Sequence, residues 1–128
     1  MIEDDYVNVG VAQLMKENGF DEPTPMVYYN YSEDNGYELE EVGGKFDEAK
    51  MLHAPSLNVA VKWIRAKSGV HISAWPIGNR EEGRWEADIR YEEDGIDATL
   101  NACGHIFGNT FEECMNKAIS YTILLHIA

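Results

Sequence analysis

The sequence has few cysteines, few basic residues and no long apolar run, and each shortage excludes a class of protein. Two cysteines, Cys103 and Cys114, are too few for a disulfide scaffold in a chain of 128 residues, so we expect free thiols in a reducing compartment. No apolar stretch approaches the roughly 20 residues of a membrane span. The acidic start MIEDDYVNVG also lacks the apolar region of a secretory signal. These absences predict a cytoplasmic protein with no membrane partner.

Basic residues are outnumbered by acidic ones, 10 Lys and Arg against 23 Asp and Glu, which gives a net charge of −13. The excess is uneven. Residues 1–56 carry 13 acidic and 3 basic residues, a net −10, whereas residues 57–128 carry 10 and 7, a net −3. Such a surface repels nucleic-acid backbones and anionic membranes. We therefore expect no nucleic-acid partner, and a protein partner of basic character fits better.

The remaining composition is that of a globular chain, with 45% apolar and 26% charged residues. Its length fits one domain, residues 1–128. Apolar periodicity and turn residues predict helices at about 9–18, 57–68 and 110–127, strands at 26–31, 37–42, 70–77, 84–91 and 99–107, and a polar loop at 42–53. The order α-β-β-α-β-β-β-α predicts an α+β fold, a mostly antiparallel sheet packed on helices. The sheet's other face is open or partly covered by the first helix.

Capping residues mark the ends of the three expected helices. Asn8, Ser56 and Thr110 are suitable N-cap residues, and Glu113 completes a T-x-x-E capping box with Thr110. Gly19 fits the left-handed position after the first helix, so that Phe20 folds back onto its apolar stripe. The expected core stripes of the two later helices are Leu57, Ala60, Val61 and Ile64, and Cys114, Ala118, Tyr121 and Leu125.

The stretch NACGHIFG, residues 101–108, is the part of the sequence that most resembles a reactive site. In a strand, Cys103 and His105 share one face, while Gly104 lies on the apolar face and admits a close helix. If Val70, Ile72 and Ala74 face the core, the face with Cys103 and His105 also gathers His71, Ser73, Trp75, Glu86, Asp88 and Arg90. A slip of one residue in strand 70–77 would reverse this placement.

The weak catalytic candidates are therefore Cys103, His105, His71 and Asp88, and the balance leans against an enzyme. A Cys–His pair needs an activated thiol and an oxyanion site, but Glu112 and Glu113 in the following helical turn repel an anion. Zinc needs four ligands, and no compact ligand motif or phosphate-binding glycine loop occurs. We expect no metal and no cofactor.

The hairpin MVYYNYSEDNGYELEE, with a turn at Asn35-Gly36, is the best candidate contact surface. Tyrosines provide contact area at low entropic cost, and carboxylates steer a basic partner. The alternative is that half of the tyrosines belong to the core. The candidate interaction residues are Tyr28, Tyr29, Tyr31, Glu33, Asp34, Tyr37, Glu38 and Glu40.

Three segments, YVNVGVAQLMKENGFDEP, HAPSLNVAVKWIRAKSGVHI and NTFEECMNKAISYTI, resemble short uncharacterised proteins of Bacteroidetes genomes and their phages and mobile elements. The central pattern A-P-[ST]-L-x-x-A-x-K-W-[IL]-R is matched from Ala54 to Arg65. The resemblance covers a little under half the chain and implies a small intracellular accessory protein, with no activity to carry over.

Three functional hypotheses follow. The first is a non-enzymatic protein-interaction module that associates with a partner or with itself as a homodimer. The second is an inhibitor that mimics nucleic-acid charge and blocks a basic host protein. The third is a small Cys/His enzyme or a metal-binding module.

Overall fold

A computed structural model describes residues 5–32, 36–78, 83–93, 96–99 and 106–127. The helices are α1 (Val9–Glu17), α2 (Leu57–Ser68) and α3 (Phe111–Thr122), and α3 continues into a π-helical turn, Ile123–Ile127. The strands are β1 (Met26–Ser32), β2 (Gly36–Glu41), β3 (Met51–His53), β4 (His71–Ile77), β5 (Arg84–Glu93), β6 (Ile96–Thr99) and β7 (Ile106–Gly108).

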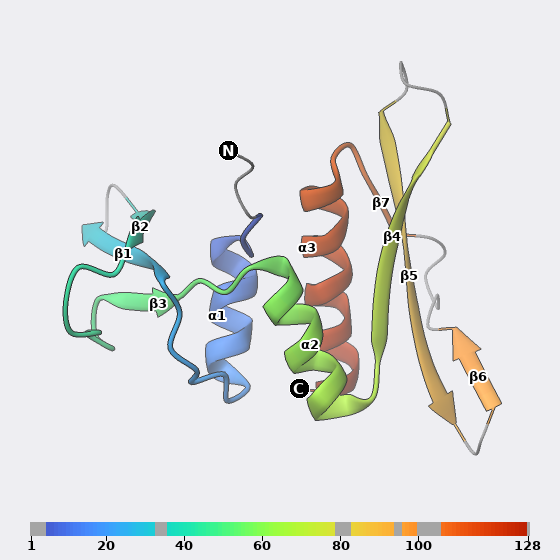
Figure 1. The fold of residues 1–128 in the computed structure, drawn as a ribbon, viewed down its shortest axis with the longest axis horizontal. Coiled ribbons are helices and arrows are strands. Elements are labelled where there is room, and N and C mark those ends of the chain that lie inside the picture. The colour runs from blue at the N-terminus through green and yellow to red at the C-terminus, as the bar shows by residue number, and fades with distance from the viewer. Residues whose placement is uncertain (1–4, 33–35, 79–82, 94–95, 100–105, 128) are drawn as a thin grey trace.

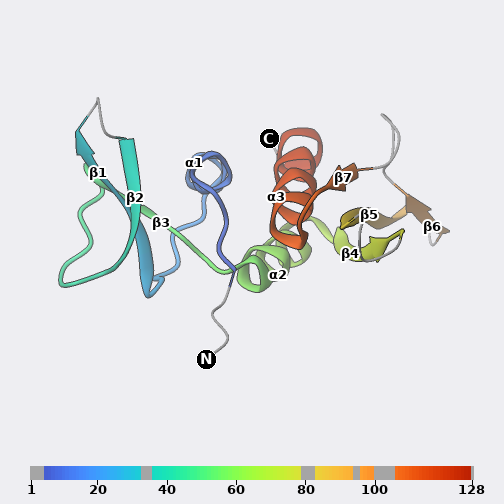
Figure 2. The same cartoon turned by 90° about the horizontal axis from the view of Figure 1, so that it is seen from above.

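The helices lie between two antiparallel sheets (Figures 1 and 2). One sheet has the strand order β2-β1-β3; in the other, β4, β6 and β7 all pair with β5. From the first sheet the layers run through α1, then α2 and α3, to the second sheet. The expected α+β class with antiparallel strands packed on helices is confirmed. Helix α1 lies on the opposite side of α2 and α3 from the second sheet, so it does not cover that sheet's outer face.

A continuous apolar core joins both sheets to the helices. Fully buried members include Met15 of α1, Ile64 of α2, Ile89 of β5 and Ile119 of α3, and Leu52 of β3 is 4% exposed. Burying side chains of this size stabilises a fold by roughly 1.5–3 kcal/mol each. The two sheets are therefore halves of one packed unit.

The expected helix caps are confirmed. The side chains of Asn8, Ser56 and Thr110 accept hydrogen bonds from backbone N–H groups three residues ahead, at 2.9, 3.2 and 3.0 Å. Glu113 closes the third cap, because its Oε2 accepts from the backbone N–H of Asn109 at 3.0 Å. That bond, with the nearby Lys117 ammonium, lowers the pKa of Glu113.

Strand β3 corrects the expected loop at 42–53. A hydrogen-bonded turn over residues 48–50 brings Met51, Leu52 and His53 antiparallel to β1, with Leu52 opposite Tyr28. Three residues are too few to show a strand period, and a sheet edge formed by β1 supplies the hydrogen bonds that the isolated segment lacks. The sequence predicts a single sheet, whereas β3 lets the first hairpin build a second one.

The end of the last helix also differs from the expected stripe. Cys114 and Ala118 are buried as expected, but Leu125 is 55% exposed and Ile123 is buried in its place. The cause is the π-helical turn, in which i→i+5 bonding shifts the phase of the side chains.

Of the expected strand 99–107, Thr99 belongs to β6 and Ile106 and Phe107 belong to β7, while residues 100–105, including Gly104, lie outside the described residues. Among the described glycines, Gly108 is one at which a helix approaches closely. A Cβ there would lie 2.5 Å from the backbone nitrogen of Cys114. Only glycine allows β7 to run this close to the start of α3.

Candidate functional site

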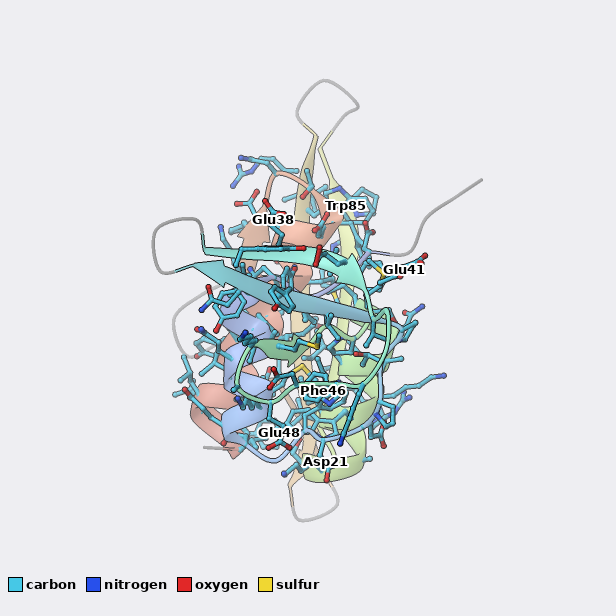
Figure 3. The ribbon with its side chains drawn as sticks, turned by 90° about the vertical axis from the view of Figure 1, so that its left-hand side faces the viewer. Asp21, Glu38, Glu41, Phe46, Glu48 and Trp85 are labelled. Atoms are coloured by element: carbon cyan, nitrogen blue, oxygen red, sulfur yellow. The ribbon has the colours of Figure 1, made fainter. Side chains whose placement is uncertain are left out.

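A cavity of about 330 Å³ lies where the end of α1 meets β3 and the loop before it. Its lining combines aromatic and charged side chains: Lys16, Phe20, Asp21, Phe46, Glu48 and His53. Figure 3 faces this side of the molecule and shows Asp21, Phe46 and Glu48 grouped below the strands. Concave sites that mix an apolar lining with a few polar groups are the usual form of a small-molecule site.

The C-terminal cap of α1 builds one wall of this cavity. Gly19 adopts a φ of 97°, which a side chain would strain, and its N–H bonds to the carbonyl of Lys16 at 3.2 Å. The N–H of Phe20 then bonds to the carbonyl of Met15 at 2.9 Å, which completes a Schellman motif. The predicted fold-back of Phe20 is thereby confirmed, and its ring meets His53 edge to face at 6.2 Å between centroids.

His53 forms the opposite wall and is held in one orientation. Its ring stacks on Phe46 with centroids 3.9 Å apart and planes 7° from parallel. The Nδ1 atom lies 3.3 Å from Oγ1 of Thr24, whose single hydroxyl proton is donated to the carbonyl of Met26 at 2.6 Å. With the hydroxyl proton on that carbonyl, Nδ1 donates to Thr24 in the neutral ring, and Nε2 keeps its lone pair as an acceptor. No bond to Nε2 occurs within the described residues.

Burial lowers the pKa of His53, and the carboxylates of Asp21 and Glu48 oppose that shift. The lower pKa favours the neutral ring, consistent with an accepting Nε2. Asp21, Glu48 and Lys16 are all exposed, so they lie at the rim, and the Lys16 ammonium donates to the backbone carbonyl of Glu48 at 3.4 Å.

A second candidate is the outer face of the first sheet, formed by Tyr29, Tyr31, Glu38 and Glu40, which we call the acidic tyrosine surface. Tyr29 lies opposite Glu38 across β1 and β2, and the Tyr29 and Tyr31 rings are 4.7 Å apart. The Tyr31 hydroxyl donates to the Glu40 carboxylate, which raises the pKa of Tyr31 to about 12. Within the described residues, none of the ion pairs involves Glu38 or Glu40.

Of the other predicted interaction residues, two tyrosines lie on the core side of the sheet and two acidic residues lie outside the described residues. Tyr28 and Tyr37 face α1 and pack against the core, and the Tyr28 hydroxyl donates to the carbonyl of Val7 at 2.5 Å. Burial, together with the charge of Glu112, raises the pKa of Tyr28. Glu33 and Asp34 lie outside the described residues.

The outer face of the second sheet carries the polar group expected from the sequence. The β4–β5 register pairs His71 with Arg90, Ser73 with Asp88 and Trp75 with Glu86. Ile72 and Ile89 are buried on the opposite face, so of the two placements open for strand 70–77 the structure has the one with His71 on the outer face.

The two catalytic candidates that the structure describes on this face, His71 and Asp88, do not form a hydrogen-bonded pair. His71 is exposed, and Asp88 accepts from Arg90 Nε at 2.7 Å rather than from a histidine. Cys103 and His105 lie outside the described residues. Cys114 is a free thiol with no exposed surface, and burial raises its pKa, which keeps it unreactive.

Sequence reasoning missed His53 altogether. The available signal was weak: a histidine beside a leucine at the end of a polar loop, with Phe46 upstream. The partners that orient His53 come from two segments, the connection between α1 and β1 with Phe20 and Thr24 and the loop with Phe46, and only the fold brings them together.

Comparison with protein families, curated proteins and solved structures gives no match for this chain. Among the helices of the described ranges, none is both long and apolar enough to cross a membrane. The described residues also contain no group of three or more His, Cys, Asp or Glu side chains placed to hold a metal ion.

Proposed function

We propose that this protein is a non-enzymatic interaction module that binds a basic protein partner through the acidic tyrosine surface. The observation that carries the proposal is the pairing of partly exposed tyrosine rings with carboxylates that form no ion pair among the described residues. Tyr31 is 52% exposed, and Glu38 is exposed beside it.

Two physical effects support this assignment. Tyrosine rings add large contact area with only two torsions to fix, and they are enriched among residues that dominate binding energy. The carboxylates speed the encounter with a positively charged partner and disfavour acidic ones. Since residues 1–56 carry a net −10, the steering field is centred on this half of the chain.

The test is a pull-down from a bacterial lysate with four baits: the unaltered protein, Tyr29→Ala/Tyr31→Ala, Glu38→Gln/Glu40→Gln, and the charge-matched control Glu17→Gln/Glu112→Gln. We expect a basic partner that is retained at low salt, weakened at high salt and lost with the first two variants. The control pair, exposed on α1 and α3, keeps the partner. Equal loss of partner binding in the control and in the Glu38/Glu40 variant would mean that binding depends on net charge alone and not on this surface.

A more specific form of the proposal is an inhibitor that mimics nucleic-acid charge and blocks a basic host protein, of phage or mobile-element origin and acting in the cytoplasm. Its support is the net charge of −13 with the excess in one half. In that case DNA competes for the captured partner, whereas an ordinary docking module is not displaced by DNA.

Self-association is a second mode of the same proposal. Two acidic tyrosine surfaces repel each other, so a homodimer would use another surface, such as that around Leu124, which is 56% exposed. Sedimentation of the unaltered protein and of Leu124→Ser distinguishes a dimer from a monomer.

A further inference from the structure

We propose that the His53 cavity binds a small organic cation with a flat aromatic body and a primary ammonium group. This binding site is separate from the acidic tyrosine surface and does not depend on a protein partner. The cavity volume of about 330 Å³ falls at the lower end of small-molecule pockets.

The walls select a flat ring. Phe20, Phe46 and His53 line the cavity, and the stacked His53 and Phe46 rings, with planes 7° apart, add flat aromatic surface to its wall. Aromatic rings pack favourably in offset or edge-on arrangements against such walls. An aliphatic amine of equal charge fills less of this surface and loses those contacts.

The rim selects positive charge. The carboxylates of Asp21 and Glu48 outnumber the ammonium of Lys16, and both act on His53 through space. Figure 3 shows Asp21 and Glu48 near Phe46 at this end of the molecule. A cation placed between the rings and these carboxylates gains from both, since aromatic faces also attract cations.

The Nε2 atom of His53 selects an N–H donor. Thr24 fixes the proton on Nδ1, so Nε2 can accept one hydrogen bond from a ligand. A primary ammonium supplies such a donor, and a quaternary ammonium does not. Because the described residues hold no three-ligand metal group, an organic cation fits this site better than a metal ion does.

The test is titration of the ¹⁵N-labelled protein with four phenols: tyramine, N,N,N-trimethyltyramine, 4-ethylphenol and 3-(4-hydroxyphenyl)propionate. These probes keep the ring and change only the charged group. We expect tyramine to shift the Gly19 amide and the indole of Trp63, which meets Phe20 at 5.7 Å between centroids. The trimethylated probe binds more weakly, and the neutral and anionic probes more weakly still.

Three variants assign the effect to residues. His53→Phe keeps the stacking ring and removes the acceptor, and we expect about tenfold weaker tyramine binding, the scale of one hydrogen bond to a charged group. Asp21→Asn/Glu48→Gln changes only exposed rim residues, so folding is preserved, and it weakens binding about two- to fivefold. His71→Phe, on the other sheet, leaves binding unchanged.

Equal binding of tyramine and 4-ethylphenol would overturn the proposal, because it would remove the role of charge. So would unchanged tyramine affinity in both the His53 and the rim variants, or the absence of Gly19 and Trp63 shifts at millimolar tyramine. If His53→Phe fails to fold, the rim variant alone decides the outcome.

Discussion

The two sheets pack on the same layer of helices and share one core, yet their outer faces differ in whether the carboxylates form ion pairs. On the second sheet, Asp88 pairs with Arg90 at 2.7 Å, and the Arg84 guanidinium lies 4.8 Å from the Phe107 ring centroid. On the first sheet, Glu38 and Glu40 have no cationic partner within the described residues. Within the described residues, the second face therefore pairs a carboxylate with a cation, whereas Glu38 and Glu40 on the first face form no ion pair.

This difference identifies the proposed binding surface more specifically than the net charge of the chain does. An overall charge of −13 acts on any basic molecule, whereas Glu38 and Glu40, which form no ion pair within the described ranges, lie with Tyr29 and Tyr31 on one face. The comparison depends on both sheets belonging to one cooperative unit, because a loosely attached first sheet would not present a fixed surface.

The largest expected effect tests that shared core. Ile64 of α2 is fully buried in the cluster that joins both sheets. Ile64→Ala should lower the free energy of unfolding by about 2–5 kcal/mol. Hydrogen exchange should rise together at Val27 of β1 and Ile89 of β5. Val59→Ala, at a 38% exposed position of the same helix, should cost less than about 0.5 kcal/mol. Faster hydrogen exchange in one sheet alone would show that the two sheets do not unfold as one cooperative unit.

A somewhat smaller effect is expected at Gly108, where β7 meets α3. The new methyl of Gly108→Ala would clash with the backbone of Cys114 at 2.5 Å, which costs about 2–3 kcal/mol because backbone must move. Gly44→Ala is the matched control, since nothing lies within 4 Å of its Cβ position. Chemical denaturation measures both, and equal midpoints for the two variants would show that the approach is not tight.

Asn116 of α3 links this helix to the start of α1, and its hydrogen bonds should contribute about 1–3 kcal/mol to the free energy of unfolding. Its Oδ1 accepts from the backbone N–H of Asn8 at 2.8 Å, and its Nδ2 donates to the carbonyl of Glu112 at 3.0 Å. Asn116→Ala leaves the Asn8 N–H without its partner and loosens the start of α1. Asn58→Ala, at an exposed site, is the control for thermal unfolding. An unchanged melting temperature in Asn116→Ala would contradict this role.

The smallest expected effect is the pH dependence from His53. Its pKa is lowered in the folded protein, so the unfolded chain binds the proton more readily. Stability should therefore fall as the pH drops below about 6.5 and through the lower folded pKa. His53→Gln should flatten that part of the curve of melting temperature against pH. An unchanged slope of melting temperature against pH in His53→Gln would contradict the burial of the His53 ring.

Local signals in the sequence account for the helices and for most strands. Asn8, Ser56, Thr110 and Gly19 act through neighbours within a few residues, so composition and spacing are sufficient to predict them. The apolar alternation of strand 84–91 predicts its core face, whereas strand 70–77 allows two placements, and the burial of Ile72 selects the one with His71 outside.

The features that escaped prediction depend on distant partners. Strand β3 exists because β1 offers it an edge, and the His53 cavity joins segments that are remote in the sequence. The division of the hairpin tyrosines is similar: Tyr28 turns inward because the carbonyl of Val7 and the helical layer lie behind it. No pattern within the hairpin itself shows that helix α1 covers one side.

The most direct test of the proposed binding surface is titration of the ¹⁵N-labelled protein with a short lysine- and arginine-rich peptide at low salt. We expect amide shifts that concentrate at Tyr29, Tyr31, Glu38 and Glu40 and vanish at high salt. These shifts should be lost in Glu38→Gln/Glu40→Gln but kept in Glu17→Gln/Glu112→Gln. Shifts centred on Ser73 and Arg90 of the second sheet, or spread evenly over both sheets, would contradict it.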